Sequence, residues 1–94
     1  MEEKFIAALT ANREKAEKLG VRIRPVDPAT ALKNAHRTLS GNRLSDCFNE
    51  LAAKGRLELS LEALAIDKRF TGLFTDEEAN NALMRLLEAG YRFS

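Results

Sequence analysis

Apolar residues recur along most of this 94-residue chain at intervals of three and four positions, the spacing of one face of an α-helix. The pattern is clearest between Leu44 and Ala52, where Cys47, Phe48 and Leu51 complete one stripe. Charged residues fill the opposite positions, so each segment needs an apolar surface to pack against. The fold class expected from this pattern is all-α, a compact bundle of about five short helices. The predicted helices cover residues 2–19, 28–39, 43–54, 61–67 and 75–89.

The stretch GRLELSLEALAID, residues 55–67, also fits a strand, because its leucines alternate with polar residues. As a strand it would belong to a winged DNA-binding domain. Ser60, however, is a preferred N-cap residue, and the alanine-rich residues after it favour a helix. No second alternating run is available to pair with a strand here. We therefore predict an extended segment over 56–59 and a short helix over 61–67.

Proline and capping residues mark where the predicted helices begin and end. Pro25 and Pro28 disfavour helix at the residue before them, which predicts an extended connector. Thr75 and Glu78 have the spacing of a capping box at the start of the last helix. The length of the chain fits one domain. Its predicted parts are the helix 2–19, the connector 20–27 and a helical core 28–94.

Three features predict a cytoplasmic protein that does not associate with membranes. No apolar run approaches the roughly 20 residues that span a bilayer, and the N-terminal segment lacks the apolar centre of a signal peptide. The single cysteine, Cys47, cannot form an intramolecular disulfide, as is usual in a reducing compartment.

The charges are divided unevenly along the chain, although the formal net charge is only +1. Residues 10–43 hold eight lysines or arginines and three acids, whereas residues 44–94 hold six bases and nine acids. Such an asymmetry can mark one surface for an anionic partner.

The inventory of reactive residues excludes most catalytic templates. His36 and Cys47 are the only histidine and cysteine, too few for a zinc site at the usual spacings. The five glycines are scattered, so no phosphate-binding loop is present. We therefore expect no enzymatic activity, no metal and no cofactor, and no small-molecule substrate is evident.

A helix-turn-helix-like hairpin supplies the leading hypothesis for function. Helix 28–39, the turn 40–42 and helix 43–54 have the order and turn length of this motif. Asp46 and Glu50 on the second helix would repel phosphates. We expect a small regulatory protein that binds DNA through the basic surface of residues 22–43. The candidate nucleic-acid-binding residues are Arg22, Arg24, Lys33, His36, Arg37, Asn42 and Arg43.

A protein-interaction module is the alternative, acting as an inhibitor, an antitoxin or an adaptor. Small amphipathic bundles associate through exposed apolar residues, either with another protein or with a second copy. The two-proline connector separates the first helix from the core, so this helix can pack within the chain or on another one. Phe5 and Ile6 in that helix are the candidate partner-binding residues.

Overall fold

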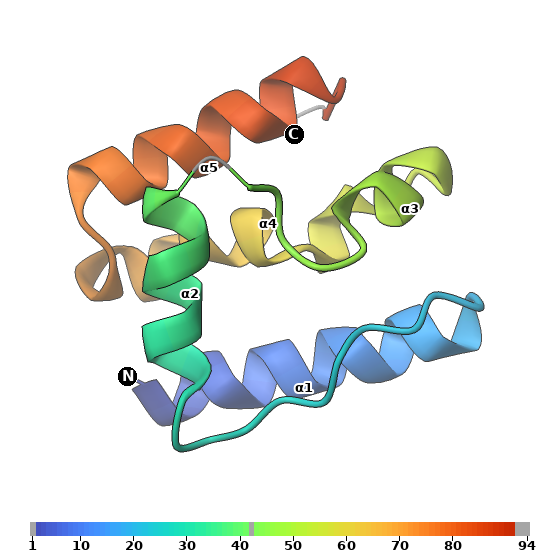
Figure 1. Ribbon diagram of the computed structural model, residues 1–94, viewed down its shortest axis with the longest axis horizontal. Helices are drawn as coiled ribbons and strands as arrows, with labels where there is room; N and C mark the ends of the chain where they lie inside the picture. The colour runs from blue at the N-terminus through green and yellow to red at the C-terminus, as the bar shows by residue number, and fades with distance from the viewer. Residues whose placement is uncertain (1, 42, 92–94) are drawn as a thin grey trace.

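Five α-helices and two 3₁₀ helices occur in the residues described by the computed structural model, 2–41 and 43–91 (Figure 1). No strand is found within these residues, which confirms the predicted all-α fold class. None of the helices is both long and apolar enough to cross a bilayer. The α-helices are α1 (Glu2–Lys18), α2 (Ala31–Ser40), α3 (Phe48–Ala53), α4 (Leu61–Ala65) and α5 (Asp76–Glu88). The 3₁₀ helices are η1 (Leu57–Leu59) and η2 (Lys68–Leu73).

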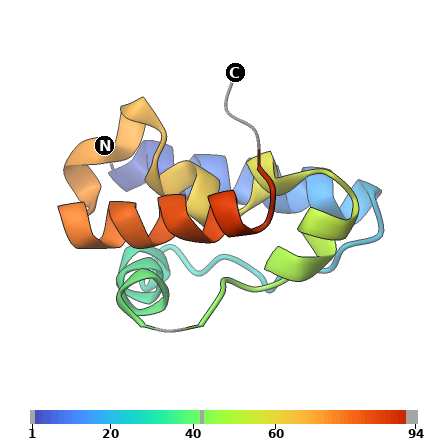
Figure 2. The same ribbon diagram turned by 90° about the horizontal axis from the view of Figure 1, so that it is seen from above.

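The connector of residues 21–27, helix α2 and residues 43–47 lie on one side of the molecule. This side, called the front side below, faces the viewer in Figure 1 and forms the lower edge in Figure 2. Helices α1 and α4 and η2 lie behind it, and α5 packs against both α2 and α4. The radius of gyration is 12.0 Å, close to the value of about 12 Å expected for a compact domain of this length.

The apolar core has two halves. In the first, Phe5 of α1 is fully buried, with the rings of Phe70 and Phe74 at 5.5 and 5.3 Å in edge-to-face arrangements. Such aromatic pairs stabilise a fold by about 0.5–1.5 kcal/mol beyond the burial of their area. The second half gathers around Leu86 of α5, and Ile66 packs against both halves. The first helix is therefore part of the chain's own core.

Local capping signals are confirmed where the sequence predicts them. Ser60 accepts a hydrogen bond from the N–H of Ala63 at 3.2 Å, as an N-cap residue does. Thr75 and Glu78 form the capping box, with reciprocal hydrogen bonds of 3.1 and 2.9 Å. The extended segment predicted over 56–59 is wrong. Ser60 donates both its N–H and its hydroxyl to the carbonyl oxygen of Leu57, and this closes the 3₁₀ turn of η1.

Helix α3 begins at Phe48, so the helix predicted over 43–54 is wrong over residues 43–47. Two carboxylates hold these residues outside a helix. Glu62 accepts hydrogen bonds from the N–H of Ser45 at 3.0 Å and from its hydroxyl, and Asp46 accepts the N–H of Arg24 at 2.9 Å. Cys47 then adopts a left-handed conformation with φ of 61°. Consequently α2 and α3 are not joined by a tight turn, and the predicted hairpin is not formed.

The carboxylate of Glu62 joins α4 to two other parts of the chain. Glu62 is fully buried, and besides Ser45 its neighbour is Arg85 of α5, at 3.6 Å. Arg85 in turn donates to the carbonyl oxygens of Thr38 at 3.2 Å and of Gly41 at 2.6 Å. Carbonyl groups at the end of a helix lack partners within the helix, so Arg85 satisfies the C-terminal end of α2. A carboxylate on α4 thus controls the path of the chain between α2 and α3.

We predict that Glu62→Ala lowers the free energy of unfolding by about 3–5 kcal/mol, the usual cost of removing one partner of a buried ion pair. The substitution leaves the guanidinium of Arg85 without its carboxylate and the donors of Ser45 without their acceptor. Urea denaturation followed by circular dichroism measures the change.

Glu58→Ala is the matched control, because Glu58 pairs with Arg56 at 2.8 Å where both side chains are more than 40% exposed. Exposed pairs of this kind contribute less than about 1 kcal/mol. Equal losses for the two variants would show that the buried pair has no special role.

Candidate functional site

Four arginines and one lysine of the predicted site are exposed, and they belong to segments that lie on the front side. Arg22 and Arg24 belong to the connector, Lys33 and Arg37 to α2, and Arg43 to the segment before α3. The two ribbon views agree that these three segments lie on the same side of the molecule (Figures 1 and 2). We call these five residues the basic face.

The other arginines that the structure describes form ion pairs, whereas the basic face does not. Within residues 2–41 and 43–91, no side chain of the basic face lies within 4.0 Å of a carboxylate oxygen. The positive charge of the basic face is therefore not compensated by direct ion pairs. The pairs found elsewhere are Arg13–Glu17 at 3.1 Å, Arg56–Glu58 at 2.8 Å, Arg69–Asp67 at 3.0 Å and Arg85–Glu62 at 3.6 Å.

Side-chain hydrogen bonds hold the connector in place, because it has no regular structure of its own. Arg13 of α1 donates its Nε–H to the carbonyl oxygen of Ile23 at 3.0 Å. The carbonyl oxygen of Arg22 lies 3.1 Å from the Sγ of Cys47, and the N–H of Arg24 is bound by Asp46. Two segments that are distant in the sequence thus fix the backbone from which the connector arginines project.

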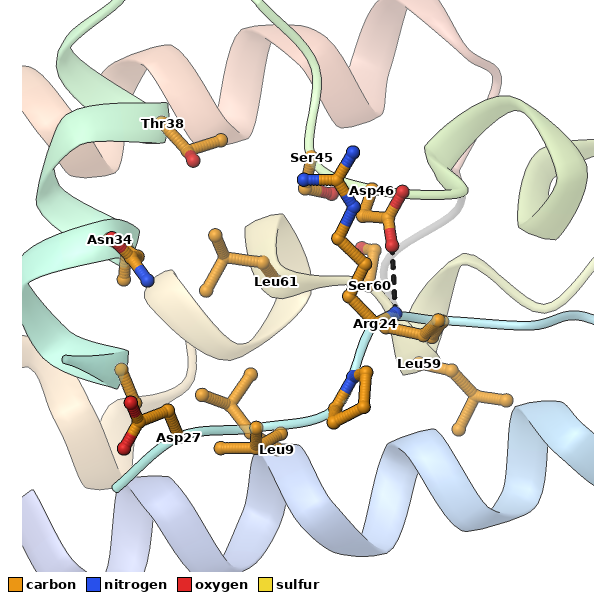
Figure 3. Close-up of a pocket in the computed structure, with 15 residues that line it drawn as sticks. Leu9, Arg24, Asp27, Asn34, Thr38, Ser45, Asp46, Leu59, Ser60 and Leu61 are labelled. Atoms are coloured by element: carbon orange, nitrogen blue, oxygen red, sulfur yellow. Dashed lines mark hydrogen bonds between the residues drawn. The ribbon is translucent and has the colours of Figure 1, made fainter. Parts of the chain in front are cut away.

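Two carboxylates on the front side reduce its positive charge. Asp27 accepts the N–H of Ala29 at 3.0 Å, and Asp46 accepts the N–H of Arg24 at 2.9 Å. Both aspartates bind backbone donors rather than side chains of the basic face. The segments of the front side therefore carry five cations and these two carboxylates, of which Asp46 stands next to Arg24 (Figure 3).

A cavity of about 180 Å³ opens beside Arg24, and Figure 3 shows the side chains that line it. The lining residues come from α1, the connector, α2, the segment before α3, and the chain from η1 to α4. No local sequence pattern marks a cavity assembled from so many segments. Its apolar walls are formed by Leu9, Ile23, Pro25, Val26, Ala31, Ala35, Leu59 and Leu61.

His36 has a structural partner and does not belong to the basic face. Its Nδ1 donates to the carboxylate of Glu78 at 2.7 Å, and its ring lies 5.4 Å from that of Phe74. Burial raises the pKa of Glu78, but hydrogen bonds from Thr75 and His36 outweigh this effect and lower the pKa below its ordinary value of 4.5. The histidine therefore couples α2 to the capping box of α5.

The thiol of Cys47 is a poor nucleophile in this environment. Burial, together with the carboxylates of Asp46 and Glu50, raises the pKa of the thiol to about 11. At neutral pH the thiol therefore stays protonated, and the thiolate is the reactive form.

Two expectations about apolar residues need correction. Phe5, a predicted partner-binding residue, has no exposed surface because the aromatic rings of the core enclose it, and Ile6 beside it is half-buried. Conversely, Leu44 and Leu87, which follow the inward pattern of their segments, are 41% and 49% exposed. The loss of helix over 43–47 explains Leu44. The last predicted site residue, Asn42, lies outside the described residues.

Comparisons with protein-family models, with curated proteins and with solved structures find no match for this chain. Within the described residues, no group of three or more histidine, cysteine, aspartate or glutamate side chains has the arrangement of a metal site.

The pKa of Glu78 predicts how stability depends on pH. A carboxyl group with a lowered pKa in the folded protein contributes stability above its ordinary pKa, and this contribution is lost as the pH falls through the folded value. We therefore expect the free energy of unfolding to decrease as the pH is lowered below about 4.5. Glu78→Gln should reduce this acid-dependent part, as measured by urea denaturation at a series of pH values.

Glu77→Gln serves as the control, because Glu77 is the exposed neighbour of Glu78 in the first turn of α5. If the two variants keep the same acid dependence as the unchanged protein, Glu78 does not cause it.

Proposed function

We propose that this protein is a small, non-enzymatic regulatory protein that binds nucleic acid through phosphate contacts of the basic face. The observation that carries the proposal is the contrast in ion pairing. The arginines of the basic face have no carboxylate partner in the described residues, whereas the described arginines elsewhere do. Unpaired guanidinium groups on one side of a domain are suited to bind phosphates, which they contact in a bidentate way.

The geometry favours contacts with the phosphate backbone of nucleic acid over insertion of a recognition helix into a groove. Helix α3 has six residues and is about 9 Å long, and Asp46 and Glu50 lie at its start. Helix α2 carries Lys33 and Arg37 as exposed residues, and the two connector arginines are exposed as well. Phosphate contacts position a protein on nucleic acid without reading its sequence. The proposed binding is therefore largely independent of base sequence.

Arg24→Ala, Arg37→Ala and Arg43→Ala together should weaken binding to duplex DNA and reduce its salt dependence. Each lost phosphate contact removes about 0.9 from the slope of log K against log salt concentration, so the triple variant should lose about 2–3. Fluorescence anisotropy of a labelled duplex at several salt concentrations measures both effects.

Arg56→Ala and Arg69→Ala form the control pair, because both side chains are already paired with carboxylates. Their removal should change the salt slope by much less. Binding that is insensitive to salt, or equally sensitive to both sets of substitutions, would refute phosphate binding by the basic face.

A second candidate function, protein binding, is favoured by a separate observation. Leu44, Met84 and Leu87 are the large apolar side chains that stand exposed in the described residues, at 41%, 47% and 49%. Leu44 and Met84 line one depression whose other lining residues are mostly polar, and Met84 and Leu87 are neighbours on α5. We call these three exposed side chains the apolar patch. Glu77 and Glu88 are close to this patch. Their charge is opposite to that of the basic face, so a second copy of the chain offers a complementary surface.

Met84→Glu combined with Leu87→Glu should abolish self-association, because the added carboxylates would lose their hydration in the interface. Sedimentation velocity over a range of concentrations measures the effect. Ala11→Glu, at an exposed position of α1 that does not line this depression, is the control. An unchanged protein that stays monomeric at all accessible concentrations would refute a second copy as the partner.

A further inference from the structure

The cavity beside Arg24 combines an apolar interior with charged groups at its edge. Leu9 of α1, Val26 of the connector and Leu61 of α4 contribute to its walls, and Arg24 extends along it (Figure 3). Ligand sites in proteins share this composition of apolar walls and a few polar groups that fix orientation. The cavity therefore has the features of a binding site in addition to the basic face.

The size of the cavity limits its occupant to one small apolar group. Its volume is about 180 Å³. An apolar cavity of about 150 Å³ accommodates one benzene ring, whereas sites for drug-sized ligands begin at about 300 Å³. An isobutyl or benzyl group fits this space.

The charged residues that line the cavity are Arg24, Asp27 and Asp46. Each aspartate uses one carboxylate oxygen for a backbone N–H, Oδ1 in Asp27 and Oδ2 in Asp46. The remaining oxygens and the Arg24 guanidinium make no hydrogen bond or ion pair with the described residues. Asp46 stands beside Arg24, so these two groups are available to a cation and to an anion at the same time (Figure 3). Asp27 lies at the other end of the cavity and adds a second negative charge to its lining.

On the side of α2, two polar side chains can orient a ligand. Asn34 donates its amide N–H to the hydroxyl of Thr30 at 3.3 Å, and its Oδ1 has no partner in the described residues. The hydroxyl of Thr38 likewise makes no hydrogen bond there. Both residues line the cavity.

We propose that this cavity binds a free hydrophobic α-amino acid, with its side chain in the apolar interior. The ammonium group contacts the carboxylate of Asp46, and the carboxylate contacts the guanidinium of Arg24 beside it (Figure 3). An amino acid of the size of leucine or phenylalanine matches both the volume and the charges. The proposal does not depend on nucleic-acid binding.

The test uses nuclear magnetic resonance titrations of the ¹⁵N-labelled protein with three matched compounds. These are leucine, isopentylamine, which lacks the carboxylate, and 4-methylpentanoate, which lacks the ammonium group. Because leucine has few atoms to contribute, we expect a Kd on the order of 1 mM. Leucine should bind most tightly and 4-methylpentanoate least, with shifts at residues that line the cavity.

Two variants separate the charge and the volume of the site. Asp27→Asn with Asp46→Asn keeps an acceptor for each backbone N–H but removes both charges, and it should weaken leucine binding about fivefold. Thr38→Met places a longer side chain in the cavity and should abolish binding. Asp76→Asn, the same change at an exposed residue away from the cavity, should leave the Kd unchanged.

The spectra also report whether each variant is folded, so a loss of binding is interpreted only for folded variants. Absence of shifts in the unchanged protein at millimolar leucine would overturn the proposal. So would tighter binding of 4-methylpentanoate than of leucine, or shifts that Thr38→Met does not remove.

Discussion

The structure depends on one charge that lies where charges are costly. Glu62 has no exposed surface, and an isolated carboxylate in such a place would destabilise the fold by several kcal/mol. It is tolerated because Ser45 supplies two donors and Arg85 supplies a positive charge. These partners are fixed in turn, since Arg85 also binds the carbonyl oxygens of Thr38 and Gly41. The compensation of a single buried carboxylate thus sets the path of the chain from α2 to α3.

The contacts of Glu62 with Ser45 and Arg85 also determine the shape of the front side. Residues 43–47 have no regular structure, and hydrogen bonds from side chains replace the bonds of a helix. Asp46, positioned next to Ser45, fixes the backbone of Arg24, and Arg24 belongs to the basic face and also lines the cavity. The two proposed binding surfaces therefore share one residue and one supporting network, although their ligands differ in kind. A substitution in the core of α4 can alter both surfaces without touching either.

The features that could be predicted from the sequence are those whose interacting residues lie close together along the chain. The capping box of Thr75 and Glu78 and the N-cap at Ser60 act over three residues, so the sequence reveals them directly. Glu62 and its partners are 17 and 23 positions apart, and no local pattern distinguishes this glutamate from an exposed one. The apolar spacing of residues 43–47 predicts a helix because a short stretch of sequence does not reveal the hydrogen bonds between Glu62 and Ser45. Phe5 has the spacing of an interface residue as much as that of a core residue, and only the position of η2 decides between them.

The bond between Arg85 and the end of α2 also has a consequence for the order of events during synthesis. The ribosome makes the connector, α2 and residues 43–47 before it makes Glu62 and Arg85. The emerging chain therefore lacks Glu62 and Arg85 when residues 43–47 are made, and of the groups that hold these residues outside a helix only Asp46 is then present. The native path after α2 therefore forms only once α5 has been translated, because Arg85 lies in α5. Synthesis of α5 thus completes a surface whose residues lie much earlier in the chain.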